Sequence, residues 1–469
     1  MPARCAFPVP ETVPQFVRRS PMPVSARALF DWHARPGAFE RLTPAWQPTR
    51  VISRTGGITG GSRVEVAVPI LHGLVHQRML MEHRNYIDGS QFTDAQIEGP
   101  FQRWEHTHNM LPVSDDASML EDRIDYELPL GALGEAAAGW FVRGQLDKLF
   151  DFRHERTRID LERHQQFASE PRRTVAITGG TGMIGSALTW LLRTGGHTVR
   201  WITRAPDALR GDIGWNPEKG ILDPASLAGV DAVVHLAGAN VGERWTPEHK
   251  REILTSREQG TRTIVTAMLG MAIPPDVMVS GSAVGYYGDT GSTVLDETAK
   301  IGAGFLAEVT RAWEAGTQPA ADAGVRVAIA RTGVVLSPAG GALAKMLPAF
   351  RLGLGGPLGS GRQWMSWIAL DDEIGALHFL LMTRKCRGVF NLTAPTPVEN
   401  AEFGHTLGSV LHRPAIIPVP ELALKALFGE MAQATILGGQ RAMPRRLEEA
   451  GFQFQHPTLA EALRFESGR

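Results

Sequence analysis

Residues 175–185 carry the feature that most constrains the fold of this chain, a glycine-rich turn between an apolar run and a helical pattern. The run 175–177 is typical of a buried strand. The apolar residues that follow the turn recur at helical spacing: Ile184, Leu188, Leu191 and Leu192. The sequence therefore predicts a strand, a tight turn and a helix, which is the context that a phosphate-binding glycine turn requires.

The three glycines of this turn have different tasks. Gly179 can adopt backbone angles that are closed to other residues. Gly182 lets a pyrophosphate approach the backbone, and Gly185 lets the helix pack closely against the strand. The helix begins near Met183 and Ile184, where free N–H groups and a partial positive charge face the phosphates. We expect these five residues to bind a dinucleotide; the alternative is a glycine turn without a ligand.

Composition excludes several classes of protein. The 469 residues carry a formal net charge of −1, so no overall field favours nucleic acid or acidic lipid. There is no apolar run of about 18 residues that would predict a membrane span, and the N-terminus lacks the apolar core of a secretory signal. Cys5 and Cys386 are too few for a disulfide framework or a zinc site. We expect a cytoplasmic protein.

The position of the glycine-rich turn predicts three domains. About 170 residues precede it, enough for a domain of their own. The polar segment 165–173 contains Pro171 and is interpreted as a linker. We expect a ligand-binding domain at 1–168, a dinucleotide-binding domain at 172–410 and a helical domain at 411–469.

The first domain has the pattern of an α+β fold. An opening strand at 16–20 precedes a helix that Ser25 can cap, and helical apolar spacing returns over 132–164. Six strand-like runs lie between them, at 49–54, 62–69, 74–83, 91–97, 103–111 and 119–127. This order, with the stretch 99–108, resembles the helix-grip fold of the START-like, polyketide-cyclase-like family. The resemblance implies a curved sheet around a long helix, often with a cavity for an apolar ligand.

Several histidines of this domain raise the question of a metal. His106 and His108 share one face of a predicted strand, and His72, His76 and His83 are near in sequence. No carboxylate or cysteine stands at a recognised ligand spacing. A structural role is therefore favoured, and we predict no metal site.

The second domain alternates strand and helix patterns, which predicts a doubly wound parallel sheet of the α/β class. The expected strands are 174–178, 198–203, 231–236, 276–281, 325–331 and 388–392. Apolar residues over 415–466 then indicate a compact helical tail.

The end of the second of these strands indicates which dinucleotide binds. An NAD site usually has Asp or Glu there, to hold the ribose 2′-hydroxyl. This chain has Thr203 and Arg204 instead. Arginine suits a 2′-phosphate through paired, charge-assisted hydrogen bonds. We therefore predict NADP as the cofactor; the alternative is that Arg204 is a solvated loop residue.

The strand that ends near His235 is followed by small residues. Leu236, Ala237 and Gly238 leave room for the ribose and adenine of the cofactor. No nucleophile is at hand to pair with His235, so we expect it in the core.

Further motifs follow the fingerprint 178–185, at 235–238, 260–261, 280–283, 287–289 and 331–335. They resemble the extended short-chain dehydrogenase/reductases, in the group of nucleotide-sugar epimerases. Details at 244–245, 250, 256–257, 282–288 and 364–368 resemble one atypical subfamily, often labelled "epimerase family protein" and sometimes "cell division inhibitor". The resemblance covers nearly all of residues 174–466, helical tail included.

The resemblance also implies roles for individual residues. Ser256 and Arg257 match a pair near the cofactor, which makes Arg257 a candidate phosphate or ribose contact and Glu252 a weaker one. In one interpretation, the substrate side of the cleft is lined by residues of the last motif, namely Trp364, Ser366 and Trp367. In the other, the two tryptophans belong to the core.

The chain departs from the parent family at its catalytic pair. Typical members use Tyr-x-x-x-Lys, in which the tyrosine exchanges a proton with substrate and the lysine lowers its pKa. None of the four tyrosines here is followed by such a lysine, and alignment of the following helix puts Leu306 and Thr310 at the two positions.

Other residues could replace that pair. Ser282 stands where the family places its carbonyl-binding serine. Tyr287, or its neighbour Tyr286, could supply the missing phenol or pack beneath the site. Asp289 and Glu297 are further candidates.

Three functions are compatible with these residues. The first is an NADP-binding oxidoreductase or epimerase-like enzyme acting on an unknown small molecule. The second is a regulator that binds NADP without turnover, which the missing Tyr-x-x-x-Lys pair favours. The third is an apolar-ligand carrier that works through the first domain. Ser282 and the intact nucleotide turn favour the enzyme.

Overall fold

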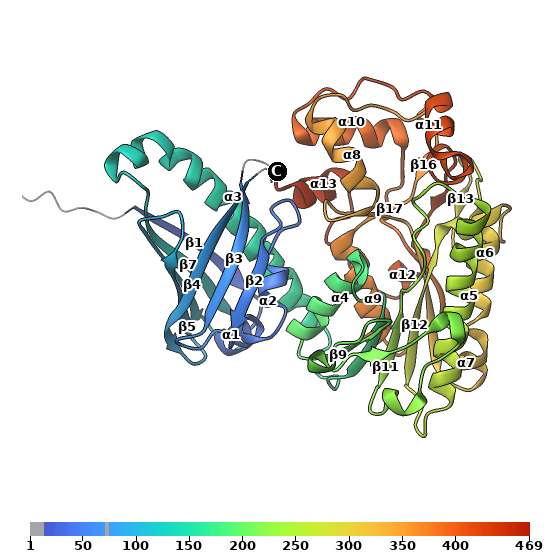
Figure 1. Ribbon diagram of the computed structural model, residues 1–469, viewed down its shortest axis with the longest axis horizontal. Helices are drawn as coiled ribbons and strands as arrows, with labels where there is room; N and C mark the ends of the chain where they lie inside the picture. The colour runs from blue at the N-terminus through green and yellow to red at the C-terminus, as the bar shows by residue number, and fades with distance from the viewer. Residues whose placement is uncertain (1–13, 71–74) are drawn as a thin grey trace, which may run out of the picture. The chain divides into compact units, whose positions relative to one another are not determined.

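The computed structural model describes residues 14–70 and 75–469. They form two compact units, unit 1 ending at Gln165 and unit 2 running from Gln166 to Arg469 (Figure 1). The change from one unit to the next falls at the start of the polar segment interpreted as a linker. Among the described helices, none is long and apolar enough to cross a membrane.

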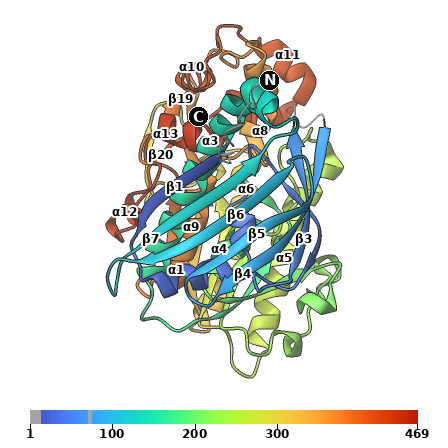
Figure 2. The ribbon, with the colours of Figure 1, turned by 90° about the vertical axis from the view of Figure 1, so that its left-hand side faces the viewer.

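Unit 1 is built on an antiparallel sheet of seven strands in the order β1-β7-β6-β5-β4-β3-β2, whose face is seen in Figure 2. The strands are β1 (Gln15–Met22), β2 (Arg50–Thr55), β3 (Arg63–Ile70), β4 (Val75–Ile87), β5 (Gln91–Glu98), β6 (Arg103–Pro112) and β7 (Ser118–Glu127). The opening strand and the six further strands expected from the sequence are confirmed.

Three helices complete unit 1, namely α1 (Ala26–Ala34), α2 (Ala38–Arg41) and α3 (Ala132–Gln165). Ser25 caps α1 as expected, because its hydroxyl accepts the N–H of Ala28. The long helix α3 packs its apolar residues against the sheet, and the rings of Phe150 and Phe16 lie 5.3 Å apart. The α+β architecture predicted for this part of the chain is confirmed.

Unit 2 is built on a parallel sheet of seven strands in the order β10-β9-β8-β11-β12-β14-β18. The strands are β8 (Thr174–Thr178), β9 (Thr198–Thr203), β10 (Ile213–Gly214), β11 (Ala232–His235), β12 (Val277–Ala283), β14 (Arg326–Thr332) and β18 (Gly388–Leu392). The chain proceeds outward from β8 to β10 and then returns to start β11 on the other side of β8. Such a reversal creates a crevice at the carboxyl ends of the strands, where ligands bind. The doubly wound sheet is confirmed; only the two-residue strand β10 was not expected.

Helices cover both faces of this sheet (Figure 1). One face carries α4 (Met183–Thr194) and α9 (Leu370–Met382), and the other carries α5 (Pro247–Leu269), α6 (Phe305–Ala315) and α7 (Gln318–Asp322). Side chains alternate along each strand, so Val175 and Ile177 belong to one apolar core and Ala176 to the other. Burial on both faces explains why β8 and β11 are mainly apolar.

The C-terminal part of unit 2 is helical, as expected. It contains α8 (Gly341–Arg351), α10 (Asn400–Leu411), α11 (Glu421–Phe428), α12 (Arg445–Glu449) and α13 (Leu459–Ser467). Leu447 joins the sheet's core, and Leu459 and Leu463 pack in a separate cluster. A short strand, β20 (Arg441–Ala442), pairs with β13 (Val294–Leu295) and ties this region to the loops after β12.

Candidate functional site

The glycine-rich turn has the geometry that phosphate binding requires. Gly179 has φ +71°, and a Cβ there would meet the Leu236 carbonyl carbon at 3.0 Å. A Cβ on Gly185 would lie 2.2 Å from the Gly179 oxygen, so close helix packing depends on this glycine. Gly182 precedes α4 without a side-chain cap, which leaves the first N–H groups of the helix available, those of Met183 and Ile184 included. The cradle fits a pyrophosphate.

Thr178 joins this turn to the end of β11. Its hydroxyl oxygen accepts the N–H groups of Leu236 at 3.0 Å and Ala237 at 3.1 Å. The same hydroxyl pairs with Nδ1 of His235 at 2.8 Å, while Nε2 pairs with Thr261. Burial lowers the pKa of His235 to about 3, so the ring stays neutral. The expectation that His235 is a core residue is confirmed.

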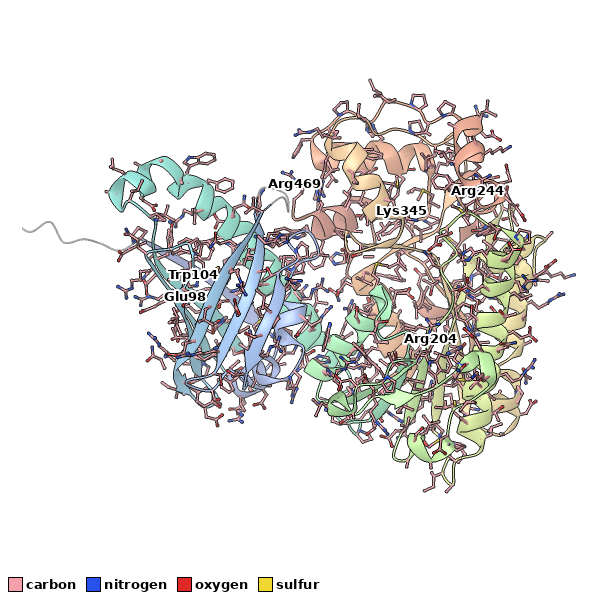
Figure 3. The ribbon with its side chains drawn as sticks, viewed as in Figure 1. Glu98, Trp104, Arg204, Arg244, Lys345 and Arg469 are labelled. Atoms are coloured by element: carbon pink, nitrogen blue, oxygen red, sulfur yellow. The ribbon has the colours of Figure 1, made fainter. Side chains whose placement is uncertain are left out.

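Arg204, labelled in Figure 3, follows β9 directly, and its side chain is exposed. Within 14–70 and 75–469, no acidic side chain pairs with it. The acids nearest in sequence are occupied elsewhere, because Asp212 pairs with Arg210 at 2.8 Å and Asp207 caps the N–H of Leu209. The Thr203 hydroxyl accepts only the nearby N–H of Ala205, at 3.3 Å. A free cation without a competing carboxylate fits a 2′-phosphate better than a ribose 2′-hydroxyl.

Arg257 lies beneath the loop after β11. Its Nη1 donates to the Ala239 carbonyl at 3.1 Å, and its guanidinium lies 4.9 Å from the Trp313 ring centre. A Cβ on Gly238 would come within 2.9 Å of the guanidinium carbon. Burial lowers the pKa of Arg257 to about 10. The structure thus brings Arg257 to the predicted cofactor loop, whereas Glu252 is exposed and its carboxylate contacts His249, at 3.2 Å, on its own helix.

Ser282 belongs to a buried polar cluster. Its hydroxyl donates to the Glu314 carboxylate at 2.7 Å. Arg331 binds the same carboxylate through Nε at 2.7 Å and Nη2 at 2.8 Å. Nη1 of Arg331 donates to the Tyr287 hydroxyl at 3.1 Å, and that hydroxyl donates to the Asn391 side-chain oxygen at 2.7 Å. Ser282 and Tyr287 are therefore linked through one ion pair.

Strand register explains why this cluster forms. Ser282 on β12 lies opposite Arg331 on β14, which lies opposite Asn391 on β18. All three side chains therefore point to the face that α6 covers. Glu314 reaches them from α6, four residues beyond Thr310, and sequence reasoning missed it. The signal was available, because residues four apart share a helix face.

The tyrosines of the cluster differ in exposure. Tyr287 is only 1% exposed; burial raises its pKa, and Arg331 opposes that rise. Tyr286 is half-buried, and the Arg331 guanidinium lies 3.3 Å from its ring centre. The other acids considered have structural partners: Asp289 faces the N–H of Gly291, and Glu297 accepts the N–H of Asn391. The structure therefore places Tyr287, and not these acids, next to Arg331.

The tryptophan motif divides between core and surface. Trp367 is fully buried, so it belongs to the core. The Ser366 hydroxyl donates to the Gln440 carbonyl and accepts the N–H of Ala442, each at 2.8 Å, which ties down the C-terminal segment. Trp364 is half-buried beneath Arg441.

A buried acid on the opposite face of the sheet was also missed. Glu373 lies in the first turn of α9, and its Oε1 accepts the Thr332 hydroxyl at 2.8 Å. Its Oε2 has no hydrogen-bond partner in the described parts of the chain. Burial raises the pKa of Glu373 to about 8, so the carboxyl group holds a proton at neutral pH.

Unit 1 contains a cavity of about 480 Å³. Most of its wall is apolar, and it includes Val66, Met81 and Phe92. The polar and charged residues in the wall include His33, His83, Asp94, His106, His108 and Arg153. The volume is in the range of small-molecule sites.

Charges in this wall are set by burial and by carboxylates. Burial lowers the pKa of His106 to about 4. Burial acts in the same direction on His108, but Asp122 and Asp94 outweigh it and raise the pKa of His108 to about 9. Of the other histidines noted from the sequence, His76 is exposed and His72 lies outside the described residues.

Comparisons with known proteins agree with the geometry of unit 2. A model of the NAD dependent epimerase/dehydratase family matches residues 175–392, and one of a domain of unknown function, DUF1731, matches residues 419–466. An epimerase family protein of Mycobacterium bovis is 48% identical over 296 residues, which covers 63% of this chain and 98% of that protein. Epimerase family protein SDR39U1 of Homo sapiens is 38% identical over 294 residues, covering 62% and 98%.

Two solved structures extend the comparison. A nucleoside-diphosphate sugar epimerase from Corynebacterium glutamicum has a TM-score of 0.78 at 31% identity, covering 97% of this chain and 90% of that one. The human epimerase family protein SDR39U1 (isoform 2), solved with NADPH, has a TM-score of 0.58 at 37% identity, covering 63% and 99%. The first likeness, which covers 97% of this chain, includes unit 1.

Proposed function

Because this chain belongs to the NAD dependent epimerase/dehydratase family, we propose that it is an NADP-dependent oxidoreductase or epimerase-like enzyme of the extended short-chain dehydrogenase/reductase type, acting on a small molecule. One observation carries the choice of cofactor, namely Arg204, exposed and without an acidic partner among the described residues, directly after β9. The human relative solved with NADPH supports the same choice.

The chain's own residues would hold NADP in three places. The N–H groups of Met183 and Ile184 would bind the pyrophosphate, which Gly182 lets approach the backbone, helped by the positive end of α4. Thr203 and Arg204 would bind the 2′-phosphate. The loop Leu236–Gly238, held down by Thr178 and Arg257, would line the ribose and adenine. When bound, NADP supplies a site for hydride transfer.

Two residues of the polar cluster are proposed for the chemistry. Ser282 would hydrogen-bond a substrate carbonyl or hydroxyl oxygen, in exchange for its bond to Glu314. Tyr287 would hold the proton that moves to or from that oxygen. Arg331 donates to the Tyr287 hydroxyl and would stabilise a phenolate, as the missing lysine does in the parent family.

Binding and turnover test this proposal separately. Calorimetry should show tighter binding of NADPH than of NADH, and Arg204→Glu should reverse the preference because a carboxylate repels the 2′-phosphate. Equal or tighter binding of NADH to the natural chain would contradict the proposal. NADPH oxidation is then measured against a panel of carbonyl compounds. NADPH binding without turnover on any of them would favour the alternative of a regulator.

A second candidate function rests on the cavity in unit 1. We propose that unit 1 is a START-like helix-grip domain that captures an apolar small molecule, for the same enzyme or as a carrier. The apolar wall and the volume of about 480 Å³ support this. Native mass spectrometry of the purified chain should detect a bound small molecule, and Met81→Trp, which fills the cavity, should expel it.

A further inference from the structure

Three side chains on neighbouring strands of unit 1 converge at the cavity wall. Asp94 on β5 lies directly opposite His106 on β6, and His108 shares the same face of β6. One carboxylate oxygen and one nitrogen from each ring all lie within 4.8 Å of one another. All three residues line the cavity. The sheet register therefore assembles a set of two imidazoles and one carboxylate that sequence spacing does not show.

A second layer of side chains orients the two rings. Asp122 on β7 lies opposite His108, and its Oδ1 is 2.8 Å from Nε2 of His106 and 2.6 Å from Nδ1 of His108. Asp122 thus leaves Nδ1 of His106 unused, while Nε2 of His108 faces Oδ2 of Asp94. The other oxygen of Asp122 pairs with His154 at 2.6 Å. Histidines that bind metals are held in this way, with the second ring nitrogen on a carboxylate.

Distances and charge agree with a divalent cation. Nε2 of His108 is 3.4 Å from Oδ2 of Asp94, which is long for a hydrogen bond between charged groups. It is close to the roughly 3.3 Å that separates two ligands of a tetrahedral Zn²⁺ with bonds of about 2.0–2.1 Å. Two carboxylates, those of Asp94 and Asp122, contact the two rings, and a divalent ion that binds there would displace the proton that His108 holds.

We propose that Asp94, His106 and His108 bind a divalent transition-metal ion, with Zn²⁺ as the reference ion, on the wall of the unit 1 cavity. Three protein ligands leave at least one coordination position for water or for the polar group of a cavity ligand. Asp122 orients both rings, and His83, 2.5 Å from the other oxygen of Asp94, holds the carboxylate. The site is independent of the dinucleotide site proposed for unit 2.

The test uses the full chain, made without a polyhistidine tag and stripped with a chelator. Co²⁺ is titrated in while visible absorption is recorded, and Zn²⁺ is then added as a competitor. We expect one Co²⁺ per chain, with the intense d–d bands of a four- or five-coordinate site, and displacement by Zn²⁺. His108→Ala should weaken Zn²⁺ binding by about 100-fold or more, and Asp122→Asn by about 10- to 100-fold.

A control variant and a substitute variant complete the test of the metal site. His76→Ala removes an exposed histidine on β4 and should leave the Zn²⁺ affinity unchanged. If His108→Ala fails to fold by circular dichroism, the isosteric Asp94→Asn takes its place, with the same expected loss. No stoichiometric Co²⁺ binding by the natural chain, or an equal loss in His76→Ala, would overturn the proposal. NADPH binding is measured in parallel, because the metal site should survive Gly182→Val.

Discussion

The two units gather polar groups in different ways. In unit 2, a parallel sheet ends in a crevice where the backbone itself offers the contacts: the N–H groups that follow Gly182 and the small residues after β11. In unit 1, an antiparallel sheet presents side chains such as Asp94 and His108 from one face toward a cavity. A site formed by backbone groups is disrupted by substitutions that add side-chain atoms. A site formed by side chains is disrupted by substitutions that remove them, and it depends on pH when those side chains titrate.

The largest effect is expected from a substitution that adds side-chain atoms to the backbone site of unit 2. Gly182→Val should abolish measurable NADPH binding, because branched methyl groups would occupy the path of the pyrophosphate. The fold should survive, since a Cβ at this position has only one close neighbour, the Gly179 oxygen at 3.2 Å. Calorimetry and a thermal melt measure both quantities.

A control for this substitution exists in unit 1. Gly60 has open space around it, so Gly60→Val should leave NADPH binding unchanged. Undiminished affinity in a folded Gly182→Val variant would place the cofactor elsewhere.

The next effect concerns a buried side chain in unit 2. The pKa of Glu373 is raised to about 8 from 4.5, so the folded state keeps a proton that the unfolded state has lost. The contribution of Glu373 to the free energy of unfolding should therefore be largest below about pH 4.5. It should fall as the pH rises from about 4.5 to 8. Glu373→Gln should remove this dependence and stabilise the protein by about 2–4 kcal/mol at pH 8.5.

Urea unfolding at a series of pH values measures this effect. Glu170→Gln, which changes a half-buried acid of the same unit, is the matched control. Parallel stability curves for the natural chain and Glu373→Gln would show that Glu373 is ionised in the fold.

A smaller effect is expected for Arg204, the side chain of unit 2 that we propose as a ligand of the 2′-phosphate. Arg204→Ala should weaken NADPH binding by about 1.5–3 kcal/mol, the contribution of a hydrogen bond to a charged group. NADH binding should stay the same, because NADH lacks the 2′-phosphate. Arg262, exposed on α5, supplies the control variant Arg262→Ala. A similar loss for both cofactors would assign Arg204 a structural role.

The smallest expected effect tests the polar cluster. Ser282→Ala should lower kcat/KM by about 10- to 100-fold, as expected for a lost hydrogen bond to developing charge. NADPH affinity should not change. Tyr287→Phe is the companion variant, and Ser467→Ala, whose hydroxyl donates to carbonyls of its own helix, is the control. Full activity in Ser282→Ala would remove this serine from the mechanism.

The sequence could predict those features whose residues lie close together along the chain. The glycine-rich turn lies in eleven successive residues, and the periodicity of strands and helices gave both sheets. Glu314 and Glu373 were not predicted, because their partners Ser282 and Thr332 come from distant strands. Asp94 and Asp122 were not predicted as partners of the histidines for the same reason. Each faces a histidine only through strand register, which is set by tertiary structure.

Gly238 and Arg257 illustrate how the structure limits the substitutions this chain can accept. A side chain at 238 would collide with the guanidinium carbon, 2.9 Å from the position of a Cβ. Loss of the guanidinium would in turn leave the Ala239 carbonyl without that donor and expose the face of Trp313. A side chain at 238 would thus require the Arg257 guanidinium to move, and with it the bond to the Ala239 carbonyl. We therefore expect substitutions at positions 238 and 257 to be coupled during divergence.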